Sequence, residues 1–312
     1  MSLSPQEENG IVLMILRDTH NILSHTPNFS FDYNANVKLQ KVVFLLADAL
    51  NIPLTRSWYH FGPFVYNKNV KFEKLSYFPA ILNEETRTEI SEAEKIISER
   101  RENYYKQLNL LVPRLFFMKL DDLLAEVYGK YAPAPYKPVY FSNLNLNKDF
   151  KLAKSRVSCD EEVISRFTNN LSILTANLAS FEDMSFMYDY ADEFATTLES
   201  CLIKMSSSGK VSIGHLGMLK ATYEAAIWNP VSLKISINTL TGSNTEPVKL
   251  EQYDKLVKNE PYIKHRLAFL ENILSKNAML ASINDKSEFF KSRYGDDKKF
   301  VDAVVNVWKS YK

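Results

Sequence analysis

The chain has 312 residues, of which 46% are hydrophobic and 24% are charged, a composition typical of one large or two ordinary soluble domains. Its 38 lysine and arginine residues and 37 aspartate and glutamate residues give a formal net charge of +1. This balance argues against a dedicated nucleic-acid-binding protein, because such proteins normally carry a basic excess. The two cysteines, Cys159 and Cys201, form neither a disulfide framework nor a zinc motif, so we expect a reducing, cytoplasmic setting. No apolar run approaches the length of a membrane span.

The first part of the chain is predicted to hold two amphipathic helices and a hairpin. Residues 5–25 carry an apolar stripe typical of a helix packed on one face. A second helix is expected over residues 36–50, where apolar residues recur every three or four positions. The aromatic segment 58–66 predicts a short hairpin that bends at Gly62 and Pro63, because glycine permits a tight turn and proline fixes the next φ.

Further helices are predicted over residues 68–78, 86–111 and 119–131. The segment 131–150 holds three prolines within six residues, followed by a run of asparagines, and we interpret it as a linker. The predicted organisation is therefore a compact helical domain over residues 1–130, a Pro/Asn-rich linker over 131–150 and a helical C-terminal domain over 151–312.

The second half has the pattern of a helical bundle. Apolar residues repeat at helical spacing over residues 163–181 and again over 187–202, which predicts two long helices whose apolar faces could receive a partner. Residues 233–240 predict a lone strand. Shorter helices are expected near residues 213–228, 249–258, 261–281 and 298–311. The fold class is therefore mainly α, a compact helical domain with a small β-hairpin followed by a helical bundle; a winged-helix arrangement of residues 36–66 is an alternative.

Two motifs lie close together in the first domain: KLQKVVFL at residues 38–45 and WYHFGPF at residues 58–64. A third segment, LDDLLAEVY at residues 120–128, is followed by a tyrosine and a proline. Together these segments resemble the Panacea (SocA-like antitoxin) domain family over about residues 5–135. The chain departs from that family in its Phe-Val-Tyr sequence at residues 64–66 and in its long C-terminal half. The resemblance implies a helical domain that binds proteins, as a toxin-neutralising antitoxin or as an adaptor in mobile-element and defence operons.

The motifs supply four candidate partner-binding residues. Lys38 and Lys41 are three apart on a helix and are expected to turn away from its apolar stripe, where they either contact an acidic partner or phosphate, or form a solvated surface. Alternate residues of a strand face the same way, so Trp58 and His60 are predicted to share one side of the hairpin. One side of the hairpin is expected in the core, and the side with His60 is either exposed for binding or buried.

A second group of candidate partner-binding residues is basic and lies at the linker: Lys148, Lys151, Lys154 and Arg156. These residues could contact an acidic partner or nucleic acid, which clustered cations bind by releasing counterions. No nucleophile, metal or phosphate-binding motif occurs, so we expect no enzyme activity, metal or cofactor.

The function predicted from the sequence is a non-catalytic protein-interaction subunit. It would be an antitoxin-like or adaptor component of a toxin–antitoxin or anti-phage defence system, and its partner would be a toxin or another subunit of the defence complex. A winged-helix-type nucleic-acid-binding protein is the alternative. No membrane partner is expected.

Overall fold

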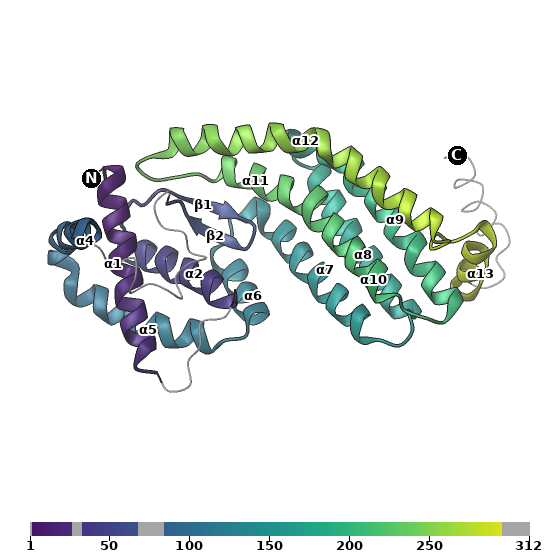
Figure 1. Cartoon of the computed structure of the whole chain (residues 1–312), viewed down its shortest axis with the longest axis horizontal. Helices are drawn as coiled ribbons and strands as arrows, with labels where there is room; N and C mark the ends of the chain where they lie inside the picture. The colour runs from purple at the N-terminus through teal and green to yellow at the C-terminus, as the bar shows by residue number, and fades with distance from the viewer. Residues whose placement is uncertain (1, 27–32, 68–83, 295–312) are drawn as a thin grey trace. The chain divides into compact units, whose positions relative to one another are not determined.

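The computed structural model describes residues 2–26, 33–67 and 84–294, and the chain divides into two compact units (Figure 1). One unit is Met1–Lys137 with Ser232–Leu256, and the other is Pro138–Val231 with Val257–Lys312. The described residues are mainly α-helical, with one two-stranded antiparallel sheet. The predicted fold class, helical with a small β-hairpin, is therefore confirmed.

The first unit places a β-hairpin among helices. Its elements are α1 (Pro5–Ser24), α2 (Tyr33–Ala49), β1 (Arg56–Tyr59), β2 (Gly62–Val65), α4 (Glu84–Ile96), η2 (Ser98–Arg100), α5 (Arg101–Phe117), α6 (Leu120–Tyr131) and η3 (Ala134–Tyr136), together with most of α11 (Asn229–Asn238) and the first part of α12 (Thr245–Lys276). Helix α2 packs against α1, α5 and β2, so it joins those two helices to the hairpin.

The start of α1 follows from its sequence. Ser4 accepts a hydrogen bond from the backbone N–H of Glu7 at 3.2 Å, and the Glu7 carboxylate accepts one from the backbone N–H of Ser4 at 2.7 Å. This reciprocal pair is a capping box, and Pro5 occupies the first helical position, where no N–H is needed. Helix α1 then packs closely on α4 at Gly10. This close approach requires glycine, because a Cβ there would clash with the backbone carbonyl of Glu89.

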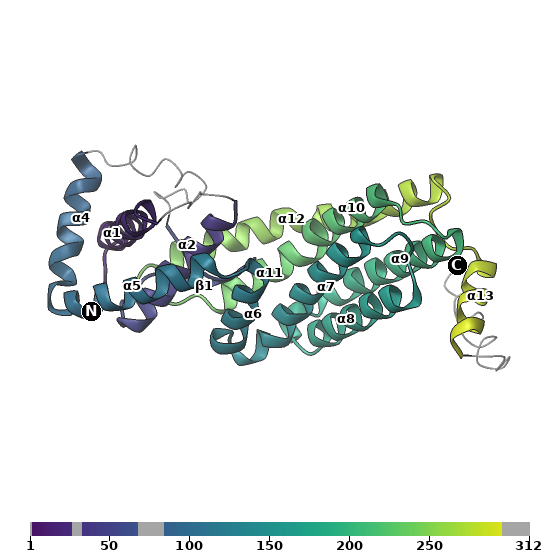
Figure 2. The ribbon, with the colours of Figure 1, turned by 90° about the horizontal axis from the view of Figure 1, so that it is seen from below.

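The second unit is a bundle in which α7 (Lys137–Ser155), α8 (Glu161–Ala179) and α9 (Phe186–Ser208) run side by side in Figures 1 and 2. Its other elements are η4 (Glu182–Met184), α10 (Ile213–Thr222), the π-helical turn η5 (Tyr223–Trp228), the start of α11, the rest of α12 and α13 (Ile283–Tyr294). The core is aromatic: the rings of Phe150 and Phe167 lie 4.8 Å apart, and Tyr223 lies 5.7 Å from Phe194. The Tyr223 hydroxyl donates to Asn143 Oδ1 at 3.0 Å.

The prediction of a linker over residues 131–150 is wrong, because most of this segment is helix α7. Pro133 and Pro135 lie at the break between α6 and α7, and Pro138 lies in the first turn of α7. A proline in the first turn breaks no helical hydrogen bond, because the N–H groups of that turn have no intrahelical acceptor. The boundary between the two units falls at residues 137 and 138.

Other elements also differ from the prediction. The strand expected over residues 233–240 is helix α11, whose Ser232 and Ser236 are buried along with its apolar residues. A helix buried on most sides lacks the polar face that would mark it as helical. The helix expected over 86–111 is divided into α4 and α5, and α12 continues through Pro261 as one helix. The helices expected over 68–78 and 298–311 lie outside the described residues.

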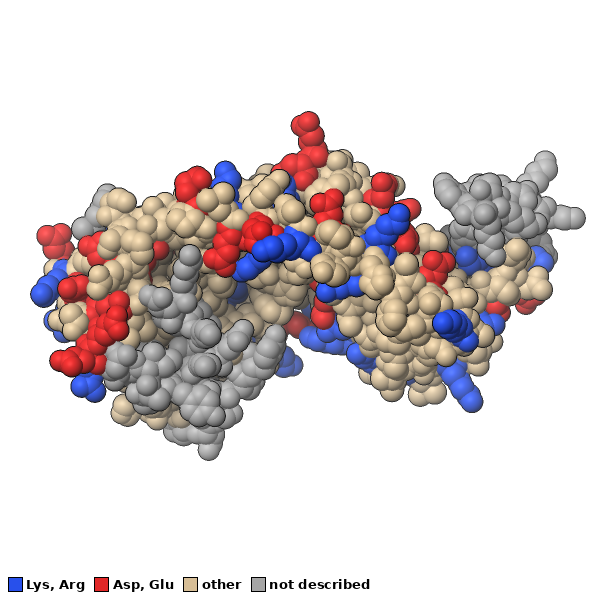
Figure 3. All heavy atoms as spheres, turned by 45° about the horizontal axis from the view of Figure 1, so that its top comes forward, with Lys and Arg blue, Asp and Glu red and all other residues tan. Residues whose placement is uncertain are grey.

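The long helices expected at 163–181 and 187–202 are present as α8 and α9. Their apolar residues are buried, and the two helices pack on each other, so the prediction that these faces receive a partner is not supported by the packing. Basic and acidic side chains both occur along the face shown in Figure 3, as the net charge of +1 leads one to expect. Within the described ranges, no helix is both long enough and apolar enough to cross a membrane.

Candidate binding site

The two edges of the hairpin are both covered by other parts of the first unit. At the β1 edge, Arg56 exchanges two backbone hydrogen bonds with Thr241, at 2.8 and 2.9 Å. The backbone N–H of Trp58 donates to Thr239 Oγ1 at 3.0 Å. The loop after α11 therefore acts as a short third strand beside β1.

The β2 edge is covered by two neighbouring side chains of α2. In the hairpin register, Pro63 lies opposite Trp58 and Val65 lies opposite Arg56, positions whose backbone groups face away from the partner strand. The Val65 N–H donates to Gln40 Oε1 at 3.3 Å, and Lys41 Nζ donates to the Pro63 carbonyl at 2.8 Å. Gln40 and Lys41 of the first motif thus supply the hydrogen-bond partners for the outward-facing backbone groups of β2. This contact is a physical reason why the two motifs occur in the same chain.

Lys41 is buried, with 2% of its surface exposed. Burial lowers the pKa of its amine to about 7, because the charged form loses its hydration. The expectation that Lys41 lies on a solvated face is therefore wrong. Lys38 is half-buried, and its amine donates to the Phe116 carbonyl at 2.6 Å and lies 5.9 Å from the centroid of the Phe116 ring. Both lysines of the motif therefore donate hydrogen bonds to backbone carbonyls within the first unit.

A pocket of about 290 Å³ lies between α2 and the hairpin. Its described walls are mostly aromatic or apolar, and Lys41 is the one lysine, arginine, aspartate or glutamate among them. The lining residues are Asn36, Val37, Gln40, Lys41, Tyr59, His60, Phe61, Gly62 and Phe64. The rings form a connected cluster, with 6.0 Å between Tyr59 and Phe64 and 4.7 Å between His60 and Phe61. Burial also raises the pKa of Tyr59.

The turn of the hairpin is fixed by Gly62. Its φ is +89°, a value that side chains with a Cβ rarely adopt, and an added Cβ would also clash with the Tyr128 ring of α6. Trp58, 5% exposed, packs edge-on against Phe44 and near Tyr128. The prediction that Trp58 and His60 share one side of a strand is wrong, because β1 ends at Tyr59 and His60 lies in the turn. Trp58 is buried in the core, whereas His60 is half-exposed and lines the pocket.

Of the four candidates in the first unit, the structure brings Lys41 and His60 together at the pocket, with Trp58 behind them and Lys38 bonded to α5 instead. Other residues that line the pocket were not predicted from the sequence as site residues: Gln40, Tyr59, Phe61 and Phe64. The signal for Gln40 was its place beside Lys41 in the first motif. The signal for the rings was the density of aromatic residues in the second motif.

The basic candidates of the second unit do not form a comparable site. Lys148 and Lys154 are half-buried and Lys151 is exposed, all on α7. Arg156 follows α7 and lies 3.5 Å from Asp160 and 3.4 Å from Glu162. Their neighbour Asp149 is 1% exposed and bonds Arg166 and Asn170 at 2.8 and 2.5 Å, so it serves the fold rather than a surface.

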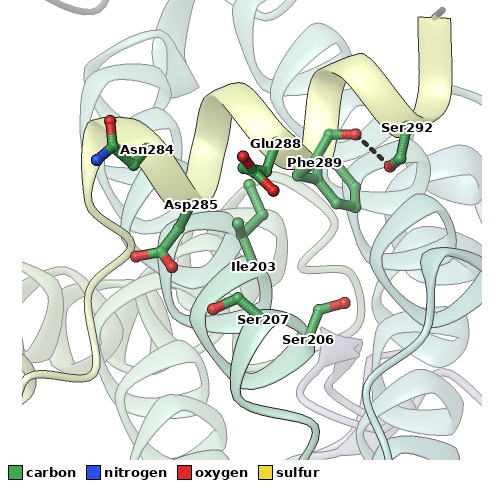
Figure 4. Close-up of a pocket in the computed structure, with 8 residues that line it drawn as sticks. All are labelled: Ile203, Ser206, Ser207, Asn284, Asp285, Glu288, Phe289 and Ser292. Carbon is green, nitrogen blue, oxygen red and sulfur yellow. Dashed lines mark hydrogen bonds between the residues drawn. The ribbon is translucent and has the colours of Figure 1, made fainter.

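A second pocket, of about 440 Å³, lies between the end of α9 and α13, and its lining is mostly polar apart from Ile203 and Phe289 (Figure 4). Its central carboxylate is already used: Asp285 accepts hydrogen bonds from the Ser282 N–H and hydroxyl at 2.8 and 2.7 Å and from Lys204 at 3.1 Å. Desolvation raises the pKa of Asp285, but these hydrogen bonds outweigh it and lower the pKa. The Asp285 N–H in turn donates to Ser282 Oγ at 3.1 Å, so the two residues cap the N-terminus of α13. No cluster of metal-ligating side chains occurs among the residues that the structure describes.

A second buried ionisable side chain, Glu8, was also not predicted from the sequence. Glu8 of α1 accepts hydrogen bonds from the N–H and hydroxyl of Thr55 at 3.1 and 2.8 Å, and the Thr55 hydroxyl accepts one from the N–H of Asn244 at 2.8 Å. Desolvation raises the pKa of Glu8. This residue ties α1 to the segments that flank the hairpin, so it supports the frame of the pocket.

Comparison with known proteins gives a family but no activity. The family described as "Domain of unknown function (DUF8098)" matches residues 1–296, so the chain belongs to that family. No curated protein and no solved structure matches the chain. The match spans residues of both units.

Proposed function

We propose that this member of the DUF8098 family is a cytoplasmic, non-catalytic protein-interaction subunit that holds its partner at the pocket between α2 and the hairpin. By the resemblance of residues 5–135 to the SocA-like family, it would be antitoxin-like or an adaptor, and its partner a toxin or another subunit of a defence complex. The observation that supports the binding role most directly is the group of half-exposed rings around the pocket, Tyr59, His60, Phe61 and Phe64.

Aromatic residues are enriched among the side chains that dominate protein interfaces, because they bury a large area with few rotatable bonds. These rings are carried by a hairpin whose two edges are hydrogen-bonded to α2 and to the loop after α11. A surface held this firmly loses little conformational entropy when a partner binds. The geometry therefore favours recognition of a protein at this site.

The test is co-purification of the chain with the products of its neighbouring genes, with Phe61→Asp as the probe and Leu110→Asp as the matched control. Leu110 is 61% exposed on α5 and does not line the pocket. We expect Phe61→Asp to release the partner and Leu110→Asp to retain it, with both variants folded by circular dichroism. Equal retention by the two variants would contradict the site, and failure of every neighbouring product to bind would contradict the function.

The alternative, a nucleic-acid-binding protein, has less support because Lys38 and Lys41 donate to backbone carbonyls and Arg156 lies beside two carboxylates. Lys151 remains exposed on α7. A mobility shift at low salt that weakens with Lys151→Glu would favour this alternative, since counterion release makes such binding salt-dependent.

A further inference from the structure

Gln40 and Lys41 carry hydrogen-bond donors that the described fold does not use. Gln40 Oε1 accepts a hydrogen bond from the Val65 N–H, and the two N–H groups of the Gln40 amide remain available as donors. In its protonated form the Lys41 amine has three N–H groups, and one of them is donated to the Pro63 carbonyl. Neither side chain makes another hydrogen bond within the described part of the chain. Both residues are more than nine-tenths buried and both line the pocket.

The chemistry of these groups selects an acidic ligand. Every unused polar group on Gln40 and Lys41 is a donor, and Lys41 is the pocket's one formally charged side chain among the described lining residues. A carboxylate has two oxygens that together accept several hydrogen bonds, and its charge would restore the protonated form of Lys41. An acceptor with negative charge therefore complements the pocket floor.

The rest of the pocket selects an apolar group of limited size. About 290 Å³ is near the lower end for ligand pockets, which is room for one large side chain. A partner strand cannot pair with β2 here, because Gln40 and Lys41 already occupy its free edge. A chain terminus meets these conditions, since its last residue carries a carboxylate and a side chain on the same Cα.

We propose that the pocket captures the C-terminal residue of the partner polypeptide. Its carboxylate accepts hydrogen bonds from the Gln40 amide and the Lys41 amine, and its apolar side chain lies among Tyr59, His60, Phe61 and Phe64. This inference rests on the proposed function and specifies how the partner is recognised.

The first test compares tetrapeptides that end in leucine, phenylalanine or tryptophan, each as the free acid and as the C-terminal amide, by calorimetry with the full chain. Because the amide lacks the charge that Lys41 binds, we expect the best free acid to bind at least about tenfold more tightly than its amide. Lys41→Met should remove this difference. Lys38→Met, which alters the other lysine of the same motif, should preserve it. Equal affinities for acid and amide, or a preference that survives Lys41→Met, would overturn the proposal.

A second variant guards against a folding defect in Lys41→Met. Gln40→Glu keeps an acceptor for the Val65 N–H but places a negative charge beside the ligand carboxylate, so we expect the free acid to lose its advantage over the amide. In nuclear magnetic resonance of lysine amines, the free acid should raise the pKa of Lys41 and the amide should leave it unchanged. An unaltered pKa of Lys41 in the peptide-saturated chain would count against contact with the carboxylate.

The source of the carboxylate is tested with 3-phenylpropionate. If this small acid binds as tightly as the best peptide, the pocket recognises a free carboxylate and the chain-terminus proposal is wrong. A partner found by co-purification is then extended at its C-terminus by a Gly-Ser tail. Release of the extended partner supports the inference. If the extended partner still binds the wild type and is released by Phe61→Asp, the inference is overturned and the proposed function stands.

Discussion

Replacing Lys41 with methionine should change how the stability of the protein depends on pH. The pKa of the buried amine falls from 10.5 to about 7, and a tenfold change in proton affinity corresponds to about 1.4 kcal/mol. Between these two values the unfolded chain binds a proton that the folded chain does not, so the free energy of unfolding rises with pH across this window. The whole rise is on the order of 5 kcal/mol. It is fully present above pH 10.5 and is lost as the pH falls to about 7.

Methionine fills the same space without a charge, so Lys41→Met abolishes this rise. The variant also loses the hydrogen bond to the Pro63 carbonyl, which costs about 1–3 kcal/mol when a buried acceptor is left without a donor. We therefore expect Lys41→Met to be less stable than the wild type at about pH 10. At about pH 6 it should be more stable by roughly 2–4 kcal/mol, the difference between the two effects. The sign of the stability change should reverse between these conditions.

The assay is urea unfolding of the wild type and Lys41→Met at intervals from pH 6 to pH 10, followed by circular dichroism. Subtracting one curve from the other removes the titrations that the two proteins share. Lys130→Met controls for the loss of one positive charge, because Lys130 is a surface lysine beside Glu126 on α6. Parallel curves for the wild type and Lys41→Met across this range would refute the argument that burial lowers the pKa of the Lys41 amine.

Three further substitutions test the frame of the site and the second unit, each by urea unfolding. Gly62→Ala should lower the free energy of unfolding by at least about 1–3 kcal/mol, since Gly62 combines a φ of +89° with close contact to the Tyr128 ring. Gly217→Ala, at a helical position with open space around it, should raise that free energy by up to about 1 kcal/mol. Equal effects of the two substitutions would contradict the role of Gly62 in the turn. Glu8→Gln should gain stability relative to the wild type as the pH rises above 4.5, because a raised pKa means that the buried carboxyl costs more once it ionises; a constant difference would exclude this cause. Asn143→Leu should cost about 1–3 kcal/mol by leaving the Tyr223 hydroxyl without its acceptor, and adding Tyr223→Phe should recover part of that loss unless the hydroxyl finds another partner.

The helix and the hairpin that carry the two motifs could be predicted from the sequence, but the burial of Lys41 could not. On a helical projection Lys41 lies about 150° from the centre of the apolar stripe of α2, which is the usual place for a solvated lysine. It is buried because the hairpin covers that second face of the helix. A periodicity argument detects one packed face and cannot see a partner that arrives from another part of the chain.

The errors over residues 131–150 and 233–240 have related causes. Prolines were interpreted as breaking helices, although Pro138 lies where a helix tolerates it. In α11 the buried residues Val231, Leu233 and Ile235 alternate as in a strand. Ser232 and Ser236 of the same helix are buried as well. Neither local propensity nor period could separate a helix from a strand in that segment.

The division of the chain has a consequence for its synthesis on the ribosome. The first unit needs Ser232–Leu256, and the intervening 138–231 belong to the other unit. The backbone N–H and carbonyl of Arg56 therefore lack their hydrogen-bond partner, Thr241, until that residue has left the exit tunnel. A nascent chain with an unpaired strand edge is prone to associate with other chains, so association is favoured during this stretch of translation.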